Sequence, residues 1–171
     1  NLVCDRRYGD CKDMANIMVS MLRHAGLEAY HVWVGTRDLP YRYNRVPSAL
    51  ADNHMITALK MDGNFYFLDA THKALPFPYP SQGIQGKEAL ISIDKDNYLI
   101  KEIPVVKSAL NLDVDSLALK LEGSELKGKG YNHLYAYNAQ RFNRLFEQKD
   151  EEVVENIMKS AFKKGNNRGK T

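Results

Sequence analysis

A cysteine, a histidine and an aspartate stand in the order nucleophile, base and orienting carboxylate. Cys11 lies within Gly9-Asp10-Cys11-Lys12-Asp13, and His54 and Asp69 follow it in the chain. In such a set the thiolate attacks a carbonyl carbon, the imidazole accepts and returns the proton, and the carboxylate fixes the tautomer of the imidazole. These residue types together predict nucleophilic chemistry on an acyl group.

An amphipathic helix is expected to begin at or just after Cys11 and to stop at Gly26. Apolar residues recur at offsets of three and four along it: Met14, Ile17, Met18, Met21 and Leu22. The unpaired amides and the positive end of the helix dipole favour an anion at the first turn, and Asp10 is suited to cap the same amides. The position therefore favours a reactive thiol.

Strands are expected to bring His54 and Asp69 together. Residues 28–36 are rich in aromatic and branched side chains, and two further strands, 54–61 and 64–69, flank Asp62-Gly63. Asp-Gly between two such runs is a strong hairpin signal. Because His54 and Asp69 lie about equally far from this turn, we expect them to be cross-strand neighbours.

Each of these residues also has an ordinary structural explanation when taken alone. A lone cysteine is usually a small buried hydrophobe, and a lone histidine is usually a polar residue with satisfied hydrogen bonds. The joint occurrence of Cys11, His54 and Asp69 favours an active site. Cys4 is expected to be a packed free thiol, with a disulfide to Cys11, which would silence the nucleophile, as the alternative.

No metal or organic cofactor is expected. The two cysteines form no Cys-x-x-Cys pair, and the five histidines show no ligand spacing. His31 is expected to pack in a strand. His72 is expected to lie in a loop, with a place at the edge of the active-site cleft as the alternative.

The polar loop 37–53 precedes His54 directly and combines cations with aromatic rings. The candidate substrate-binding residues are Tyr41, Arg42, Tyr43 and Arg45 of this loop, together with Trp33 of the strand before it. Acidic or aromatic substrate groups would suit this composition. The alternatives are that guanidinium stacking only stiffens the loop and that Trp33 packs in the core.

Composition limits the classes of partner. With 171 residues, 44% of them hydrophobic, the chain can bury one substantial core and part of a second. A net charge of +3 and the lack of a basic, aromatic-interleaved face argue against nucleic acid. The apolar runs fall short of about 18 residues, so no membrane span is expected. A protein or peptide substrate remains the expected partner, and the sequence leaves the oligomeric state open.

The remaining chain divides near residue 104 into a core, 1–104, and a C-terminal segment, 105–171. Short strands at 89–93 and 98–103 are expected to complete the sheet that supports the histidine and the aspartate. In the C-terminal segment, alternation from Leu110 to Leu121 and a turn at Glu122-Gly123 predict hairpin or edge strands. Two helices follow, from about residue 134 to 148 and after a cap at Asp150. Lys163, Lys164 and Gly165 are expected to close the second helix before a polar tail.

Three blocks in register resemble the signature of the transglutaminase-like superfamily. They are Gly9-Asp10-Cys11-Lys12-Asp13-Met14-Ala15, Asn53-His54-Met55-Ile56 and Tyr66-Phe67-Leu68-Asp69-Ala70-Thr71. The resemblance covers roughly residues 5–104 and is greatest to bacterial transglutaminase-like proteins, often predicted to be proteases. It implies an α+β, papain-like core, with the nucleophile at a helix N-terminus packed on an antiparallel sheet. The partial C-terminal strand-and-helix segment resembles the start of a β-rich domain.

The resemblance implies Cys11 as nucleophile, His54 as base and acid, and Asp69 as the group that orients His54. Thiol-dependent acyl transfer on an amide or peptide follows, with hydrolysis favoured over transamidation. The alternative is a catalytically inactive transglutaminase-like domain that serves as a binding or assembly module.

Family members carry more sequence before the cysteine, including a residue that helps to stabilise the oxyanion, whereas ten residues precede Cys11 here. We therefore expect a processed or excised chain, in which only the Cys11 amide is assigned to the oxyanion hole. Because the resembling proteins are commonly exported from bacterial cells, the resemblance implies the periplasm or cell envelope.

Overall fold

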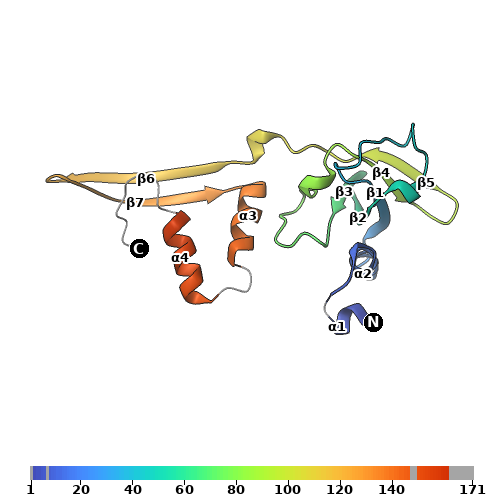
Figure 1. Cartoon of the computed structure of the whole chain (residues 1–171), viewed down its shortest axis with the longest axis horizontal. Coiled ribbons are helices and arrows are strands. Elements are labelled where there is room, and N and C mark those ends of the chain that lie inside the picture. The colour runs from blue at the N-terminus through green and yellow to red at the C-terminus, as the bar shows by residue number, and fades with distance from the viewer. Residues whose placement is uncertain (1, 7, 147–149, 162–171) are drawn as a thin grey trace. The chain divides into compact units, whose positions relative to one another are not determined.

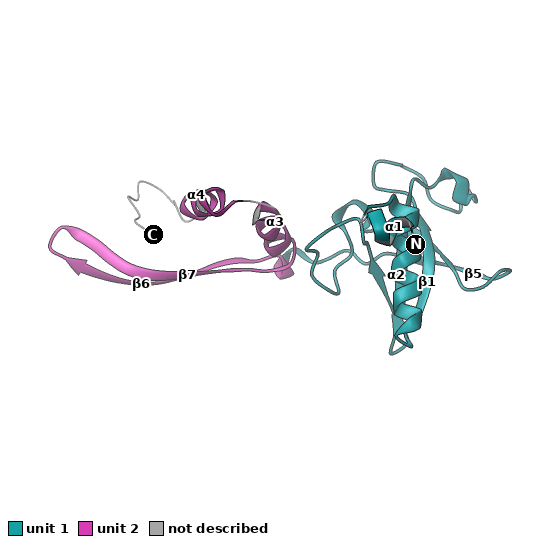
Figure 2. Ribbon diagram, turned by 90° about the horizontal axis from the view of Figure 1, so that it is seen from below, with its two compact units in different colours: residues 1–108 teal, residues 109–171 magenta. Residues whose placement is uncertain are grey.

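The computed structural model describes residues 2–6, 8–146 and 150–161. They fall into two compact units, Asn1–Ser108 and Ala109–Thr171, which Figure 2 colours separately. The predictions for Lys163, Lys164, Gly165 and the polar tail lie outside the described residues, and so does the side chain of Cys4.

The first unit combines two helices with one antiparallel sheet. The helices are α1 (Leu2–Arg6) and α2 (Cys11–His24), and the strands are β1 (Glu28–Val34), β2 (His54–Met61), β3 (Asn64–Leu68), β4 (Glu88–Ser92) and β5 (Tyr98–Glu102). The strand order is β3-β2-β1-β4-β5, and every neighbouring pair is antiparallel (Figure 1). This arrangement confirms the predicted α+β class and the predicted use of β4 and β5 to complete the sheet.

Helix α2 packs on one face of the sheet. Its buried residues are Ala15 and Val19, and the hydroxyl of Thr57 on β2 donates to the carbonyl of Ala15 at 3.3 Å. The helix ends before Gly26, whose φ of +79° is a conformation that suits glycine. The helix that begins at Cys11 is therefore held on the sheet along its length.

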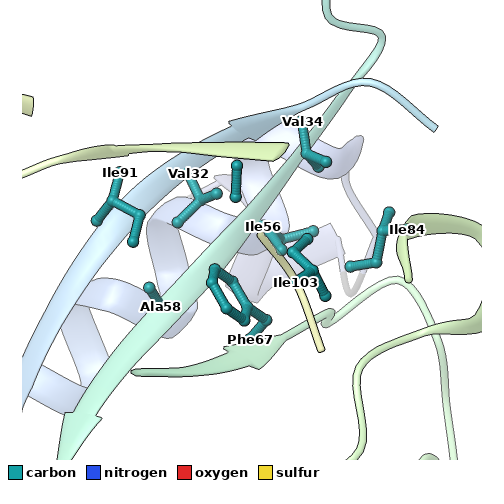
Figure 3. Close-up of a cluster of buried hydrophobic side chains, with 9 residues drawn as sticks. Val32, Val34, Ile56, Ala58, Phe67, Ile84, Ile91 and Ile103 are labelled. Carbon is teal, nitrogen blue, oxygen red and sulfur yellow. The ribbon is translucent and has the colours of Figure 1, made fainter. Parts of the chain in front are cut away.

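The opposite face of the sheet carries the main apolar core of this unit. Side chains alternate between faces along a strand, so Ile56 and Ala58 point away from the face where Thr57 meets α2. The core consists of Val32, Val34, Ile56, Ala58, Phe67, Ile84, Ala89, Ile91 and Ile103 (Figure 3). Two of its members, Ile84 and Ile103, come from segments outside the strands, so the connecting segments complete this layer.

The β2–β3 hairpin forms as predicted, but its register corrects one expectation. Met61 pairs with Asn64 across the turn, and the ladder ends at Thr57 and Leu68. His54 lies three residues beyond that last pair, where it pairs instead with Val34 of β1. His54 and Asp69 are therefore not equally far from the turn and do not oppose each other in the ladder, although their side chains do meet, with Nε2 of His54 2.9 Å from Oδ2 of Asp69.

The second unit begins with a hairpin and ends with two helices. Strands β6 (Asp113–Glu122) and β7 (Glu125–Leu134) pair along their whole length, and Gly123 in the turn has a φ of +64°. Helices α3 (Ala136–Phe146) and α4 (Glu151–Ala161) follow. The predicted hairpin and helices are confirmed. The strand alternation was expected to begin at Leu110, but residues 108–110 form a short 3-10 turn before the first strand.

Candidate active site

Cys11 is the first residue of α2, and the residues around it build the helix start. Oδ1 of Asp10 accepts from the amides of Lys12 and Asp13 at 2.9 and 3.0 Å, and Oδ2 of Asp13 accepts from the Asp10 amide at 3.2 Å. This capping box uses amides other than that of Cys11. Gly9 fits tightly beneath it, since an added Cβ would lie 2.6 Å from Cβ of Asp13. The half-buried Cys11 side chain thus lies at a capped, electropositive helix end.

His54 is the first residue of β2 and lies between Cys11 and Asp69. Its Nε2 is 2.9 Å from Oδ2 of Asp69, and its side chain is only 13% exposed. The hydrogen bond with Asp69 raises the pKa of His54 above its usual range, burial opposes this shift, and a hydrogen bond with Cys11 adds to it. Because Nε2 faces Asp69, Nδ1 is the ring nitrogen left for the thiol.

Asp69 follows β3 and has a fully buried side chain. Its Oδ2 accepts from Ser81 Oγ at 2.7 Å and lies 3.0 Å from Nδ1 of His72, in addition to the contact with His54. Its Oδ1 accepts from the amide and the hydroxyl of Thr71 at 3.1 and 2.6 Å. Burial alone would raise the pKa of Asp69, but the hydrogen bonds outweigh it and hold the pKa far below its usual range.

Two neighbours of Asp69, Thr71 and Ser81, received no role in the site from the sequence, and a third, His72, received one only as an alternative. Thr71 forms a local turn with Asp69, and the Asp-x-Thr spacing was a signal that could have found it. His72 lies in a loop, as predicted, and its contact with Asp69 corresponds to the alternative position at the edge of the site. Ser81 lies twelve positions after Asp69 along an irregular stretch of chain, and no local pattern points to it.

The five candidate substrate-binding residues fall into separate places. Tyr41, Arg42 and Arg45 line a cavity of about 520 Å³. Tyr43 is buried, and its hydroxyl contacts Asp52 and donates to the carbonyl of Trp33 at 3.4 Å. The structure therefore gives Tyr43 a packing position rather than a place on the cavity wall.

Trp33 lines a second cavity, of about 420 Å³, beside α2. The other residues of its wall are Lys12, Asp13, Asn16, His31 and Met55. Lys12 follows Cys11 in the chain, and Met55 follows His54. Trp33 is half-buried and lies beside the candidate active site. It does not share a cavity with the candidate residues of the loop 37–53.

Within residues 2–6, 8–146 and 150–161, no group of three or more histidine, cysteine, aspartate or glutamate side chains is arranged to hold a metal ion. In the same part of the chain, no helix has both the length and the apolar character that a membrane span requires.

Comparison with known proteins identifies the N-terminal part of the chain. Residues 2–70 match the family model described as the transglutaminase-like superfamily. No curated protein and no solved structure matched the chain. The matched range contains Cys11, His54 and Asp69. The resemblance drawn from the three sequence blocks is thus confirmed over residues 2–70, which form a transglutaminase-like segment within this chain.

Proposed function

We propose that the first unit catalyses thiol-dependent acyl transfer on an amide or peptide substrate. Cys11 is the nucleophile, His54 the base and acid, and Asp69 the residue that positions His54. The observation that carries this proposal is that His54 contacts the buried, ionised Asp69 through Nε2, and Cys11 also helps to raise the pKa of His54. A family that includes cysteine-dependent acyl transfer supports the same chemistry.

The reaction begins when Sγ of Cys11 attacks the substrate carbonyl carbon and its proton passes to His54. The carbonyl oxygen becomes an oxyanion, which the backbone amide of Cys11 stabilises. The intermediate collapses, the carbon–nitrogen bond breaks, and the leaving amine takes the proton from His54. The acyl group is left on Cys11 as a thioester.

The second half-reaction determines the product. A water molecule loses a proton to His54 and attacks the thioester, and the thiol of Cys11 leaves with that proton, which releases a carboxylic acid. A substrate amine at the same step would give transamidation. Hydrolysis is the favoured outcome because water is always present as an acceptor, which makes a protease or amidase the favoured activity.

The proposal also assigns different roles to the two parts of the chain. We assign catalysis to residues 1–104 and a structural role to residues 105–171, whose strand-and-helix segment resembles the start of a β-rich domain. The expected setting, taken from the resemblance alone, is the periplasm or cell envelope. Neither a metal ion nor an organic cofactor takes part in the proposed steps.

A peptide library incubated with the protein and analysed by mass spectrometry tests the proposal. Cleaved peptides indicate hydrolysis, and peptides joined to an added amine indicate transamidation. Either product should disappear in Cys11→Ala and fall steeply in His54→Ala, whereas the control Lys95→Gln, on an exposed turn, should be unchanged. If wild type and Cys11→Ala bind the same peptides and neither turns them over, the domain is a binding module instead.

A further inference from the structure

The cavity beside the loop 37–53 has a strong excess of positive charge. Four cationic side chains and one carboxylate line its volume of about 520 Å³: Arg37, Arg42, Arg45, Lys87 and Glu88. The loop contributes the three arginines, Lys87 directly precedes β4, and Glu88 is the first residue of β4. A cavity with this balance of charge favours an anionic ligand.

The single carboxylate of the cavity wall is already used to hold the loop, and Arg42 is also paired with Glu102 of β5 at 3.5 Å, so the charge of Arg42 is compensated. Glu88 accepts from the amide of Tyr43 at 2.7 Å and from Nη1 of Arg42 at 3.4 Å. Lys87 donates to two backbone carbonyls of the loop, one of them that of Tyr41 at 3.2 Å. Carbonyl groups position an ammonium ion but leave its charge unneutralised, so Lys87 still contributes a positive charge to the cavity.

Arg37 and Arg45 supply the groups that can meet a ligand. Both are exposed at the cavity wall, and within the described residues no ion pair joins either guanidinium to a carboxylate. A guanidinium presents two parallel donors that match the two oxygens of a carboxylate. The loop thus presents two such groups to the same cavity.

The strand register places this cavity near the candidate active site. Val34 of β1 pairs with His54 on one side and with Ala89 on the other, and Lys87 and Glu88 directly precede Ala89. Two strand spacings of about 4.8 Å put the backbones of His54 and Ala89 about 10 Å apart. An extended peptide rises about 3.3 Å per residue, so this span corresponds to about three residues.

We infer that this cavity binds an acidic side chain of the substrate, about three residues from the bond that is attacked. The substrate class is therefore acidic peptide, with Arg37 and Arg45 as the residues that determine specificity. The inference rests on the proposed function only in calling the ligand a substrate, because preference for an acidic peptide is a property of the cavity itself.

Calorimetric binding in the Cys11→Ala variant tests the inference apart from catalysis. The probes are two blocked hexapeptides of alternating glycine and either glutamate or glutamine. We expect the glutamate peptide to bind roughly tenfold more tightly, because two charge-assisted contacts are involved. Arg37→Gln/Arg45→Gln should remove this preference. Lys95→Gln/Lys129→Gln, which removes the same charge from exposed positions elsewhere, should keep it.

Equal binding of the two peptides would overturn the inference, and so would equal loss of preference in both double variants. Fluorescence of Trp33, the single tryptophan, verifies that each variant folds. A retained preference for glutamate without turnover in wild type would refute the proposed function and leave the acidic-ligand site. Turnover of peptides without any preference for glutamate would support the proposed function and refute the acidic-ligand site.

Discussion

Nε2 of His54 lies 2.9 Å from Oδ2 of Asp69, and the same oxygen is 2.7 Å from Oγ of Ser81 and 3.0 Å from Nδ1 of His72. A buried carboxylate that receives several hydrogen bonds keeps one orientation and remains ionised. The imidazole is therefore fixed with one nitrogen toward Asp69. Its other nitrogen is available to Cys11.

The contact between His54 and Asp69 should make the stability of the first unit depend on pH. The pKa of His54 is raised by its hydrogen bond with Asp69, so its contribution is fully present below about 6.5 and is lost as the pH rises through the raised pKa. The pKa of Asp69 is lowered, so its contribution is present above about 4 and is lost as the pH falls through the lowered pKa. Asp69→Asn should therefore cost most stability between about pH 4 and 6.5.

Urea unfolding followed by the fluorescence of Trp33, which lies in the first unit, measures this effect. The difference in free energy of unfolding between wild type and Asp69→Asn should shrink from pH 5.5 to pH 9. The control Asp96→Asn, in the exposed turn between β4 and β5, should have the same free energy of unfolding as wild type at both pH 5.5 and pH 9. A difference that is constant with pH would contradict the assigned coupling.

Ser81 should contribute to stability through Asp69. Its side chain is buried, and its hydroxyl donates to the ionised carboxylate at 2.7 Å. Ser81→Ala should lower the free energy of unfolding by about 1.5–3 kcal/mol, the usual range for a hydrogen bond to a charged group. Ser92→Ala is the matched control, because that hydroxyl, at the end of β4, makes only a 3.4 Å bond to the carbonyl of Asp94. Similar losses in the two variants, measured by urea unfolding, would refute this role.

The secondary structure of the first unit was predictable because its signals are local. Offsets of three and four define α2, and an Asp-Gly turn defines the β2–β3 hairpin. The contact between His54 and Asp69 follows from the same turn. The turn does not, however, place the two residues opposite each other in the ladder. His54 lies seven residues before Met61, whereas Asp69 lies only five residues after Asn64.

Other parts of the site depend on contacts between distant segments. Ser81 reaches Asp69 across an irregular stretch, and Lys87 contacts the loop 37–53 because the sheet places β4 beside β1. Periodicity and spacing carry no signal for such contacts. For this reason the cationic loop was predicted, whereas its second wall at the start of β4 was not.

Gly35 should be required for the position of Tyr41. It is buried, and a Cβ added there would lie 2.6 Å from Oη of Tyr41, whose hydroxyl also contacts Asp52. Gly35→Ala should therefore destabilise the first unit by about 1–3 kcal/mol, as overpacking usually does. Gly83→Ala adds the same methyl group where nothing lies within 4 Å. The prediction fails if both variants unfold at the same urea concentration as wild type.

The reactivity of Cys11 should depend on His54. A protonated imidazole beside the sulfur stabilises the thiolate, which is the form that iodoacetamide alkylates. At pH 6 we expect His54→Ala to slow the alkylation of Cys11 by at least about tenfold. The exposed His24 provides the control variant His24→Ala, which should react like wild type. Mass spectrometry of digests resolves Cys11 from Cys4, so each sample contains its own reference thiol. Equal rates in wild type and His54→Ala would show that the two side chains do not form a reactive pair, and the binding-module alternative would then be favoured.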